Sequence, residues 1–540
     1  MPRPCGRPGA RGPVGAADRP VDLAILGGGI TGSAVARDAS LRGLSAALFE
    51  QGDFSSGTTS RSSRLIHGGL RYLEGLHFGL VRESLRERDW IHRRLTHLLR
   101  PVPILIPIYR GDGRGMLRVR AGMFLYGLLA RRTALPRPGT VSAAAAIGRV
   151  PGLRPEGLAG GAVFHDYRIP VPERLVVENL LSAVEAGRKD GGSRVTVRNH
   201  ATVDWIAFSE GTCRLRVRDR RSGNAETVSA RVVINATGPW TDRTRRLAGL
   251  SGELLHPTKG VHAVLPGPVS HAMFVASPRD GRMFYILPLE GNLLLGTTDT
   301  AYSGDPGEAE PLPEEIAYLE KGSLRVLPGS SLFRQKPLFT YAGVRPLLKG
   351  KGKSESRISR RHGVFREGEG GRFVTVAGGK LTTFREMAEE AVDAACEALG
   401  RRSGCLTRES PFPGEIGGGD EGVAAFTRSL SGVYDAPESL CAHLVSLYGR
   451  RASRVLQIAR EDPGTDRRLS PHSPDIAAQV ILAAREEWAE SPEDVILRRM
   501  HLGISQDRGA CAVPAVEEIL AKELPPISPG PPNRYIPSRS

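Results

Sequence analysis

The regular pattern of the chain begins at residue 21 with a short, mostly apolar run, VDLAIL, which is followed directly by three glycines. A run of this length without polar alternation is typical of a buried parallel strand. Residues 30–42 are rich in alanine and predict a helix, and residues 44–50 (LSAALFE) predict a second strand. Strand, helix and strand in this order indicate the start of an α/β unit with a parallel sheet.

Later segments change between helical and strand-like patterns. Residues 78–100 have a helical period with many charged pairs four positions apart. Residues 190–240 and 255–300 contain alternations typical of strands, and residues 372–400 predict a strand, a glycine turn and a helix. The predicted fold class is therefore α/β with additional strands.

A change in composition at residues 410–420, SPFPGEIGGGD, divides the chain. Proline and glycine at this density interrupt regular structure, and the pattern beyond them is helical. We predict one large α/β unit over residues 21–400 and a helical C-terminal domain over residues 410–525. The ends, residues 1–20 and 526–540, predict disordered tails, and whether the first belongs to the native protein stays open.

Residues 116–132, MLRVRAGMFLYGLLARR, form an apolar stretch flanked by arginines. The apolar residues fall on nearly every side of a helix, which favours a buried helix. A second interpretation is a helix that dips into a bilayer surface, with its arginines on lipid phosphates. No apolar run in the chain reaches the roughly 18 residues that a membrane-spanning helix needs.

The composition adds a preference for anionic partners. The 540 residues include 74 Lys and Arg against 58 Asp and Glu, a net charge of +16. Such a charge favours nucleic acid, an anionic membrane or a phosphorylated substrate, whereas a coding preference for arginine would need no partner. Nucleic acid is not expected, because the basic residues form no stripe and aromatic residues, at 6%, are too few for base stacking.

The six cysteines include no CxxC pair and no spacing of a zinc module. Free thiols in a reducing compartment are the simplest interpretation, and no metal site is expected. The first 20 residues lack the apolar segment of a secretory signal. We therefore expect a cytoplasmic protein.

The glycines after the first strand form the motif GxGxxG between a predicted strand and a predicted helix. Gly27 permits the tight turn, Gly29 lets a pyrophosphate approach the backbone, and Gly32 lets the helix pack on the sheet. The N–H groups at the start of the helix attract the anionic pyrophosphate. The motif predicts a dinucleotide site that includes Gly27, Gly29, Ile30, Thr31 and Gly32.

Glu50 ends the second predicted strand. A carboxylate at this position accepts hydrogen bonds from both ribose hydroxyls of an adenosine. The same charge would repel a 2′-phosphate, so FAD or NAD is favoured over NADP.

Two segments further along the chain favour FAD over NAD. Residues 377–383, AGGKLTT, predict a second strand, glycine turn and helix, whose helix start would stabilise negative charge on a reduced flavin. Residues 235–240, NATGPW, close a strand and resemble a turn of flavoproteins. These segments predict FAD contacts at Gly238, Gly378, Gly379, Lys380, Leu381 and Thr382.

A likeness to a known family rests on DLAILGGGITGSAVARDASLRGLSAALFE, TTSRSSRLIHGGLRYLE, NATGPW, KGVH, GTTD, AGVRP and GGKLTT. The chain resembles the FAD-dependent glycerol-3-phosphate dehydrogenases of the respiratory, membrane-associated type over about residues 21–520. The resemblance implies a Rossmann-like FAD-binding fold with an antiparallel-sheet substrate domain, as in D-amino-acid oxidase, and a helical C-terminal domain. Thr31 stands where the resemblance leads us to expect Asn in several relatives.

The resemblance also implies contacts of named residues with cofactor and substrate. Ser62, Ser63 and His67 are expected beside FAD, with His67 a packed neighbour rather than a covalent link. A phosphate dianion calls for two or three cationic side chains. The substrate is therefore expected to contact Arg71, Tyr72, Arg345 and Lys380.

His262 in the KGVH stretch is a candidate catalytic base, because a histidine titrates near neutral pH. A structural histidine on a sheet face is an equally good interpretation, so the identity of the base stays open. Arg345, beside the developing alkoxide, would lower the barrier, and Arg71 and Lys380 complete the expected catalytic group. We interpret Thr297, Thr298 and Asp299 mainly as architecture.

The implied reaction is oxidation of sn-glycerol 3-phosphate to dihydroxyacetone phosphate, with hydride transfer to N5 of the flavin and electrons passed to a membrane quinone. A glycerol-3-phosphate oxidase of the same fold that uses O2 stays open as an alternative, as does an amine or amino-acid oxidase of this fold. Quinone reduction requires docking on the inner face of the cytoplasmic membrane, which the net charge of +16 supports. The oligomeric state, a homodimer included, stays open.

Overall fold

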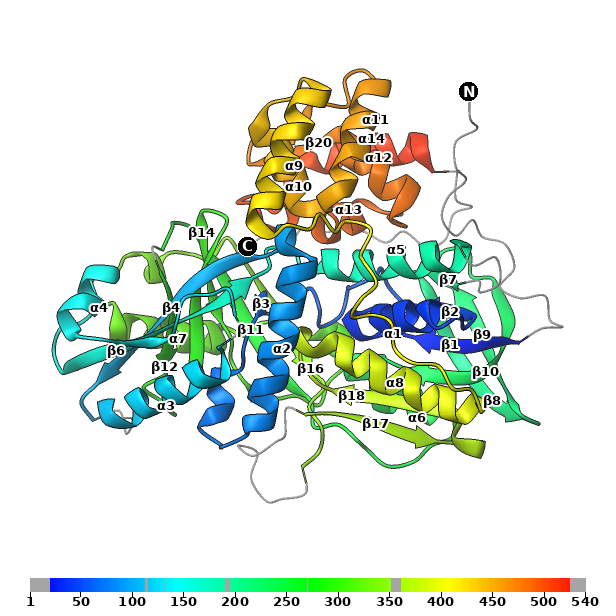
Figure 1. The fold of residues 1–540 in the computed structure, drawn as a ribbon, viewed down its shortest axis with the longest axis horizontal. Coiled ribbons are helices and arrows are strands. Elements are labelled where there is room, and N and C mark those ends of the chain that lie inside the picture. Colours follow the sequence, from blue (N-terminus) through cyan, green and yellow to red (C-terminus); the bar gives the residue numbers. More distant parts are fainter. Residues whose placement is uncertain are drawn as a thin grey trace.

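The computed structural model describes residues 20–111, 115–131, 133–189, 195–269, 271–350 and 361–524 (Figure 1). Residues 1–19 and 525–540, which hold almost all of the two predicted tails, lie outside the described residues. The described part has two large mixed sheets side by side and a group of helices, with a small two-stranded sheet, that covers one edge of both (Figure 1).

The first sheet contains the predicted α/β beginning. Strands β1 and β2 pair in parallel, and β1 also pairs in parallel with the distant strand β10. The order along the sheet is β17-β18-β10-β1-β2-β7. The bounds are β1 Val21–Leu26, β2 Ala46–Phe49, β7 Val195–Arg198, β10 Ala225–Asn235, β17 His362–Glu367 and β18 Phe373–Gly378.

Both faces of this sheet are buried, which explains the continuous apolar run in β1. Leu23 and Ile25 pack in a core under helices, while Ala24 and Leu26 pack in a second core under strands. A strand covered on both faces needs apolar residues at every position. The covering elements are α1 Ile30–Leu41, α5 Glu173–Lys189 and α8 Phe384–Leu399 on one face, and β8 Ala201–Ser209 and β9 Thr212–Asp219 on the other.

The second sheet is mostly antiparallel and has the order β15-β11-β14-β13-β12-β4-β6-β3, with β16 on β11 and β5 on β6. Helices α4 and α7 pack on one face of it, and α3 packs on the other. The strands are β3 Leu65–Ile66, β4 Arg100–Tyr109, β5 Gly139–Val141, β6 Leu158–Arg168, β11 Thr258–Leu265, β12 Ala272–Ala276, β13 Met283–Leu289, β14 Asn292–Gly296, β15 Thr300–Ala301 and β16 Phe339–Arg345. The helices are α2 Phe78–Arg94, α3 Met116–Leu129, α4 Ala143–Arg149 and α7 Pro313–Val326.

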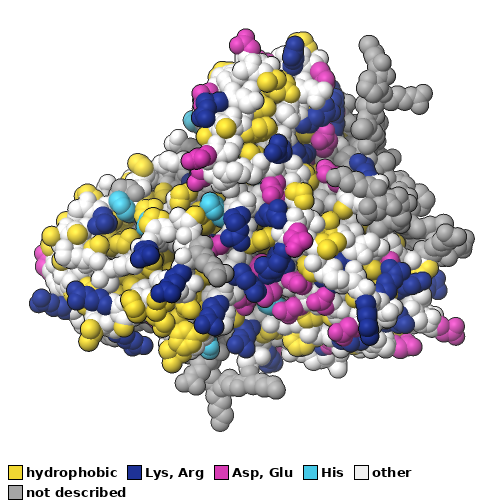
Figure 2. All heavy atoms as spheres, viewed as in Figure 1, with side chains coloured by type: hydrophobic (Ala, Val, Ile, Leu, Met, Phe, Trp, Pro, Cys, Tyr) yellow, Lys and Arg dark blue, Asp and Glu magenta, His cyan; other side chains and the backbone are white. Residues whose placement is uncertain are grey.

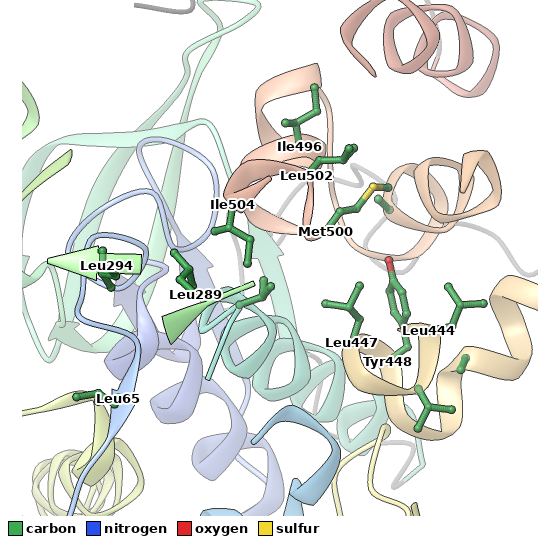
Figure 3. Close-up of a cluster of buried hydrophobic side chains, with 14 of the residues drawn as sticks. Leu65, Leu289, Leu294, Leu444, Leu447, Tyr448, Ile496, Met500, Leu502 and Ile504 are labelled. Carbon is green, nitrogen blue, oxygen red and sulfur yellow. The ribbon is translucent and has the colours of Figure 1, made fainter. Parts of the chain in front are cut away.

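The C-terminal helices pack on this assembly through one continuous apolar core. Figure 3 shows Leu289 of the second sheet beside Ile504 of the helical part, and Leu294 and Leu447 belong to the same core. The elements are α9 Gly419–Tyr434, α10 Glu438–Tyr448, α11 Ala452–Glu461, β19 Arg468–Ser470, β20 Ser473–Ile476, α12 Ala477–Glu486, α13 Pro492–Arg498 and α14 Val513–Glu523. The predicted fold class, a Rossmann-like unit with an antiparallel-sheet unit and C-terminal helices, is confirmed.

Buried ion pairs join the same parts. Arg174 of α5 binds Glu487 at 2.7 Å with both side chains fully buried. Asp53, which follows β2, accepts hydrogen bonds from Arg498 at 2.7 Å and from Arg499 at 2.9 Å. Removing one partner of such a pair would leave a buried charge alone, so these contacts fix how the helices sit.

Helix α3 departs from the prediction of a buried helix for residues 116–132. Among its described side chains only Met123 and Tyr126 are buried, whereas Leu117 is 82% and Phe124 is 70% exposed. The sequence pattern was apolar on nearly every side, but only one side of the helix meets the second sheet. The prediction was wrong because a helix is buried only where other elements pack on all its sides, and the hydrophobicity of its own residues does not show whether they do.

Candidate functional site

A cavity of about 470 Å3 runs along the carboxyl ends of β1, β2, β10 and β18. Ligands of open α/β sheets bind at this edge of the sheet. Its lining brings together the GxGxxG segment and two segments that lie more than 200 residues further along the chain. The predicted cofactor residues that line it are Gly27, Gly29, Ile30, Thr31, Glu50, Ser62, Gly238, Gly378, Gly379, Lys380 and Leu381.

The wall of this cavity at the first turn is made by backbone. Gly27 has φ of +104°, and a Cβ there would lie 2.6 Å from the carbonyl oxygen of Ala236. Gly32 faces inward from α1, where a Cβ would lie 1.9 Å from the carbonyl oxygen of Gly27. A side chain at either position would push helix and strands apart, so the close approach requires glycine.

Glu50 lies at one end of the cavity with its carboxylate held by backbone donors. Its two oxygens accept hydrogen bonds from the N–H groups of Gly28 at 2.7 Å and Gly52 at 2.8 Å. Burial raises the pKa of Glu50, although these two donors oppose the rise. Each carboxylate oxygen has a further lone pair for a ligand hydroxyl.

At the other end, β18 leads into a glycine turn and then into α8. Gly378 and Gly379 have positive φ values of +80° and +88°. The turn continues as the short helix η8, Leu381–Thr383, and Thr382 accepts a hydrogen bond from the backbone N–H of His67 at 3.1 Å. This bond ties the 60s loop to the start of α8.

A second cavity, of about 240 Å3, adjoins the first. It lies between the two sheets, and the two cavities share Thr58, Ser62, Pro346, Gly379, Lys380 and Leu381 as lining residues. All the predicted substrate and catalytic side chains line this second cavity. They are Arg71 and Tyr72 on η1 Leu70–Leu73, His262 on β11, Arg345 at the end of β16, and Lys380 after β18.

Arg345 is held in a fixed orientation at the wall of the second cavity. Its Nη1 donates to Asp299 Oδ1 at 3.0 Å, and its Nη2 donates to Thr297 Oγ1 at 2.8 Å and to the Thr298 carbonyl oxygen at 3.0 Å. Gly260 on β11 provides the space, because a Cβ there would lie 2.3 Å from Nη2. A guanidinium fixed in this way is pre-organised to bind an anion.

Lys380 and Arg71 place further cationic groups on the cavity. The ammonium of Lys380 donates to Ser84 Oγ at 2.7 Å and lies 4.5 Å from the ring centre of Tyr72. Arg71 is exposed and lines the same cavity. The second cavity therefore has several cationic side chains along its wall, as a phosphate monoester requires.

His262 lies deep in the second cavity between polar and aromatic neighbours. Its Nε2 lies 2.9 Å from Ser63 Oγ, and its ring stacks on Tyr341 with 4.7 Å between ring centres. Burial lowers the pKa of His262 well below its ordinary value, and the charges of Arg345 and Arg64 lower it further. The imidazole is therefore neutral at physiological pH and carries one nitrogen lone pair.

Four residues of the predicted cofactor set lie outside the first cavity. Ser63 and His67 line the second cavity instead. Gly32 packs against the Gly27 carbonyl, and Thr382 is buried behind the η8 turn. These last two shape the cavity through backbone position rather than by lining it.

The sequence interpretation missed several residues of the second cavity. Asp299 was interpreted mainly as architecture, yet its carboxylate pairs with Arg345. Arg61 and Arg282 also line the cavity and were not singled out. Arg61 stands within the SRSSRLIHGG stretch that carried the resemblance, so its position was a usable signal; Arg282 has no such signal.

The first cavity fits the FAD that the sequence predicts. Gly29 is the N-cap residue of α1, and within 4 Å of the position of a Cβ there only Thr59 Oγ1 is found, at 3.4 Å. The first-turn N–H groups of a helix have no intrahelical acceptors and bind phosphate. Glu50 offers lone pairs at one end, and the glycine turn before α8 lies at the other, next to the second cavity.

Models of known protein families match both parts of the chain. A family model described as FAD dependent oxidoreductase matches residues 22–385. A model described as the C-terminal domain of alpha-glycerophosphate oxidase matches residues 405–525.

Relatives are similar over most of their length. A glycerol-3-phosphate dehydrogenase of Synechocystis is 36% identical over 524 residues, which cover 92% of each chain. An aerobic glycerol-3-phosphate dehydrogenase of Staphylococcus epidermidis is 33% identical, with coverage of 89% of this chain and 87% of that protein.

Solved structures share the fold. The glycerol-3-phosphate dehydrogenase of Bacillus halodurans in complex with FAD has a TM-score of 0.74 at 26% identity, covering 94% of this chain and 90% of that one. The L-alpha-glycerophosphate oxidase of Mycoplasma pneumoniae, with FAD bound, has a TM-score of 0.53 at 18% identity, with coverage of 72% and 96%. At that identity the second likeness concerns the fold alone.

Proposed function

The chain belongs to the family of FAD-dependent glycerol-3-phosphate dehydrogenases, and from this premise we propose that it oxidises sn-glycerol 3-phosphate to dihydroxyacetone phosphate. FAD is its cofactor. The observation that carries the proposal is the junction of the two cavities, where the cavity at the GxGxxG turn meets a pocket lined by cationic side chains. Bound FAD supplies an acceptor for the hydride that leaves the substrate.

The charged residues of the second cavity would hold the phosphate. Arg345 supports this because its guanidinium is fixed by Asp299 and Thr297 before any ligand arrives. Arg71 and Lys380 line the same cavity and would add positive charge, with the ammonium of Lys380 near the Tyr72 ring. Such pre-organisation reduces the entropy cost of binding and orients the C2 carbon.

His262 is our candidate for the base that accepts the proton of the C2 hydroxyl. A neutral imidazole that lines the same cavity as Arg345 supports this role. The Ser63 hydroxyl lies 2.9 Å from Nε2 and would hold the imidazole ring in its orientation toward the substrate. Arg345 would stabilise negative charge that develops on the C2 oxygen.

We propose a membrane quinone, rather than O2, as the final electron acceptor. The specific support is an exposed apolar stripe on α3: Leu117, Ala121, Phe124 and Leu128 recur at intervals of four, three and four residues and all are exposed. This spacing places them on one face of the helix. Leu76, 70% exposed, and Phe78, 37% exposed, extend the stripe from the adjoining η1–α2 segment.

Figure 2 shows hydrophobic side chains gathered at this lower left part of the molecule, with Lys and Arg close to them. Arg118, Arg120 and Arg131 on or after α3 are exposed. An apolar stripe with arginines beside it is the pattern of a helix that lies in a membrane interface. The η1 segment behind this stripe carries Arg71 and Tyr72 of the second cavity, so docking here would bring the bilayer close to the site. None of the described helices is both long and apolar enough to cross a bilayer.

An anaerobic titration tests the reaction. Purified holoprotein should lose its flavin absorbance on addition of glycerol 3-phosphate and should keep it on addition of glycerol, which lacks the phosphate. A flavin that glycerol bleaches equally well, or that a D- or L-amino acid bleaches instead, would refute the phosphate assignment.

A vesicle assay tests the acceptor and the docking surface. Anionic vesicles that contain quinone should raise the rate, and high salt should release the protein, because salt screens the attraction of basic residues to the surface. Phe124→Glu with Leu117→Glu should abolish the gain while leaving the reduction of a water-soluble dye unchanged. The matched control is Val433→Glu, an exposed apolar residue on α9. Equal rates with O2 and without lipid would favour the oxidase alternative.

A further inference from the structure

A third cavity, of about 610 Å3, lies where the C-terminal helices meet the second sheet. The sheet contributes Arg100 and Glu290, and the helical part contributes His443, His472 and His501. None of its lining residues lines either cavity of the proposed active site. Its wall is therefore a separate collection of polar side chains without a role in the proposed reaction.

His443 and His501 lie beside each other on the wall of this cavity. Their Nδ1 atoms lie 3.4 Å apart, and the rings are tilted by 42° with 5.0 Å between centres. Two nitrogen ligands of one tetrahedral zinc ion, each at about 2.0–2.1 Å from the metal, lie about 3.4 Å from each other. The two nitrogen atoms thus already have the spacing of a ligand pair.

Asp475 fixes the orientation of the first histidine from behind. Its Oδ1 lies 2.8 Å from His443 Nε2, and the His443 side chain is only 7% exposed. Ser473 Oγ and Gln479 Nε2 donate to the same carboxylate at 2.6 and 2.9 Å. An ionised carboxylate only accepts, so Nε2 donates to it, and in a neutral imidazole the lone pair that can bind a metal then lies on Nδ1. A carboxylate behind a histidine in this way is the usual outer partner of a metal-bound imidazole.

We propose that His443 Nδ1 and His501 Nδ1 bind one zinc ion, with Asp475 as the positioning residue of His443. The ligand atoms of these three residues lie within 4.8 Å of one another. The cavity leaves room for water, and Glu290 and His472 on its wall provide further donor atoms.

Bound zinc would join two elements that are distant in sequence, α10 and the segment after α13. His443 lies on α10 and His501 follows Met500 after α13, which explains why the sequence spacing contains no zinc signature. Because Ile504 and Leu447 of the same core lie near these elements (Figure 3), a metal here would stabilise the packing of the helical part.

Cobalt titration of chelator-treated holoprotein tests the proposal. One equivalent of Co2+ should produce the visible absorption of a tetrahedral nitrogen-ligated ion, and one equivalent of Zn2+ should displace it. His501→Ala and His443→Ala should lose this spectrum, whereas His77→Ala, which removes an exposed histidine before α2, should keep it.

A thermal measurement on the wild-type protein needs no variant. Zn2+ should raise the melting temperature of the holoprotein and a chelator should reverse the rise. If cobalt gives no such spectrum and zinc shifts melting equally in wild type and His501→Ala, the two histidines form only an imidazole–imidazole hydrogen bond and the proposal is wrong.

Discussion

The two cavities of the proposed active site meet at Gly379–Leu381 but are built in opposite ways. The first is shaped by backbone, at positions where a Cβ of Gly27 or Gly32 would collide with a carbonyl group. The second is shaped by side chains, such as Arg345 and His262, that come from strands far apart in the sequence. Its key group, Arg345, depends on side-chain partners for its orientation.

The two kinds of wall give two kinds of specificity, one for the cofactor and one for the substrate. A backbone wall recognises the phosphates that all dinucleotides share, and it tolerates almost no change. A side-chain wall recognises the charge and shape of one substrate and can be changed one group at a time. Substitutions in the first cavity should therefore remove the cofactor, and substitutions in the second should alter kinetics with the cofactor in place.

The largest expected effect is at the backbone wall. Gly32→Val should give protein without bound flavin, because a Cβ would lie 1.9 Å from the Gly27 carbonyl oxygen and would separate α1 from β1. The measurement is the ratio of flavin to protein absorbance after purification.

The matched control for this prediction is Gly43→Ala. Gly43 follows α1 with a positive φ of +74°, and nothing lies within 4 Å of the position of its Cβ. This change should cost about 1 kcal/mol of stability and leave flavin content unchanged. Full flavin content in Gly32→Val would contradict the view that backbone shapes the first cavity.

The second prediction concerns the side-chain wall. Arg345→Ala should lower kcat/KM for glycerol 3-phosphate by about 30-fold to 4,000-fold, equivalent to roughly 2–5 kcal/mol. Flavin content should stay unchanged, because Arg345 lines the second cavity and not the first. Steady-state kinetics with a flavin assay on the same sample measures both. A variant that loses its flavin would show that the two cavities are not separable.

The first cavity could be predicted from sequence because its geometry is local. Gly27, Gly29 and Gly32 stand within six residues, and the strand and helix around them fix the turn. The second cavity was found chiefly through resemblance, since Arg345 and His262 meet only through the register of β11 and β16. Residues 297–299 follow β14 and contact Arg345, and no sequence pattern predicts that these two segments meet.

The fold shows the same limit at α3. Its apolar composition resembles that of α12, yet Ala477–Ala484 of α12 are all buried, while Leu117 and Phe124 of α3 are exposed. Helix α12 has neighbours on all sides in the C-terminal core, whereas α3 packs on one face of the second sheet with only one of its sides. Periodicity predicts that a helix forms, but its burial depends on elements elsewhere in the chain.

The third prediction concerns Asp299, which orients Arg345 and does not have to contact the phosphate itself. Asp299→Asn keeps the shape but removes the charge that holds Arg345 Nη1 at 3.0 Å. We expect kcat/KM to fall by about tenfold, near the lower end of the 1.5–3 kcal/mol of a charge-assisted hydrogen bond. The loss should appear mainly in KM, and it should vanish in the Arg345→Ala background, as a double-mutant cycle would reveal. Independent, additive losses would show that Asp299 does not act through Arg345.

The smallest expected effect is in the pH profile. Burial, Arg345 and Arg64 all lower the pKa of His262, so its neutral, base-competent form persists to lower pH than that of an ordinary histidine. The phosphate of the substrate itself titrates near pH 6. As the pH falls, log kcat/KM should therefore decrease with a slope of about one against pH, because only the substrate phosphate takes up a proton in this range. An additional histidine of ordinary pKa would give a slope of two.

The Arg345→Ala variant provides the control for this profile. Removing the guanidinium removes one cause of the low pKa of His262 but leaves the larger one, burial. The onset of the acid limb, which the substrate sets, should stay in place in the variant, whereas a further descent due to His262 should begin at a higher pH than in the wild type. A wild-type slope of two, with no change in the variant, would show that His262 titrates like an exposed histidine, and the base would then have to be sought among the other side chains of the second cavity.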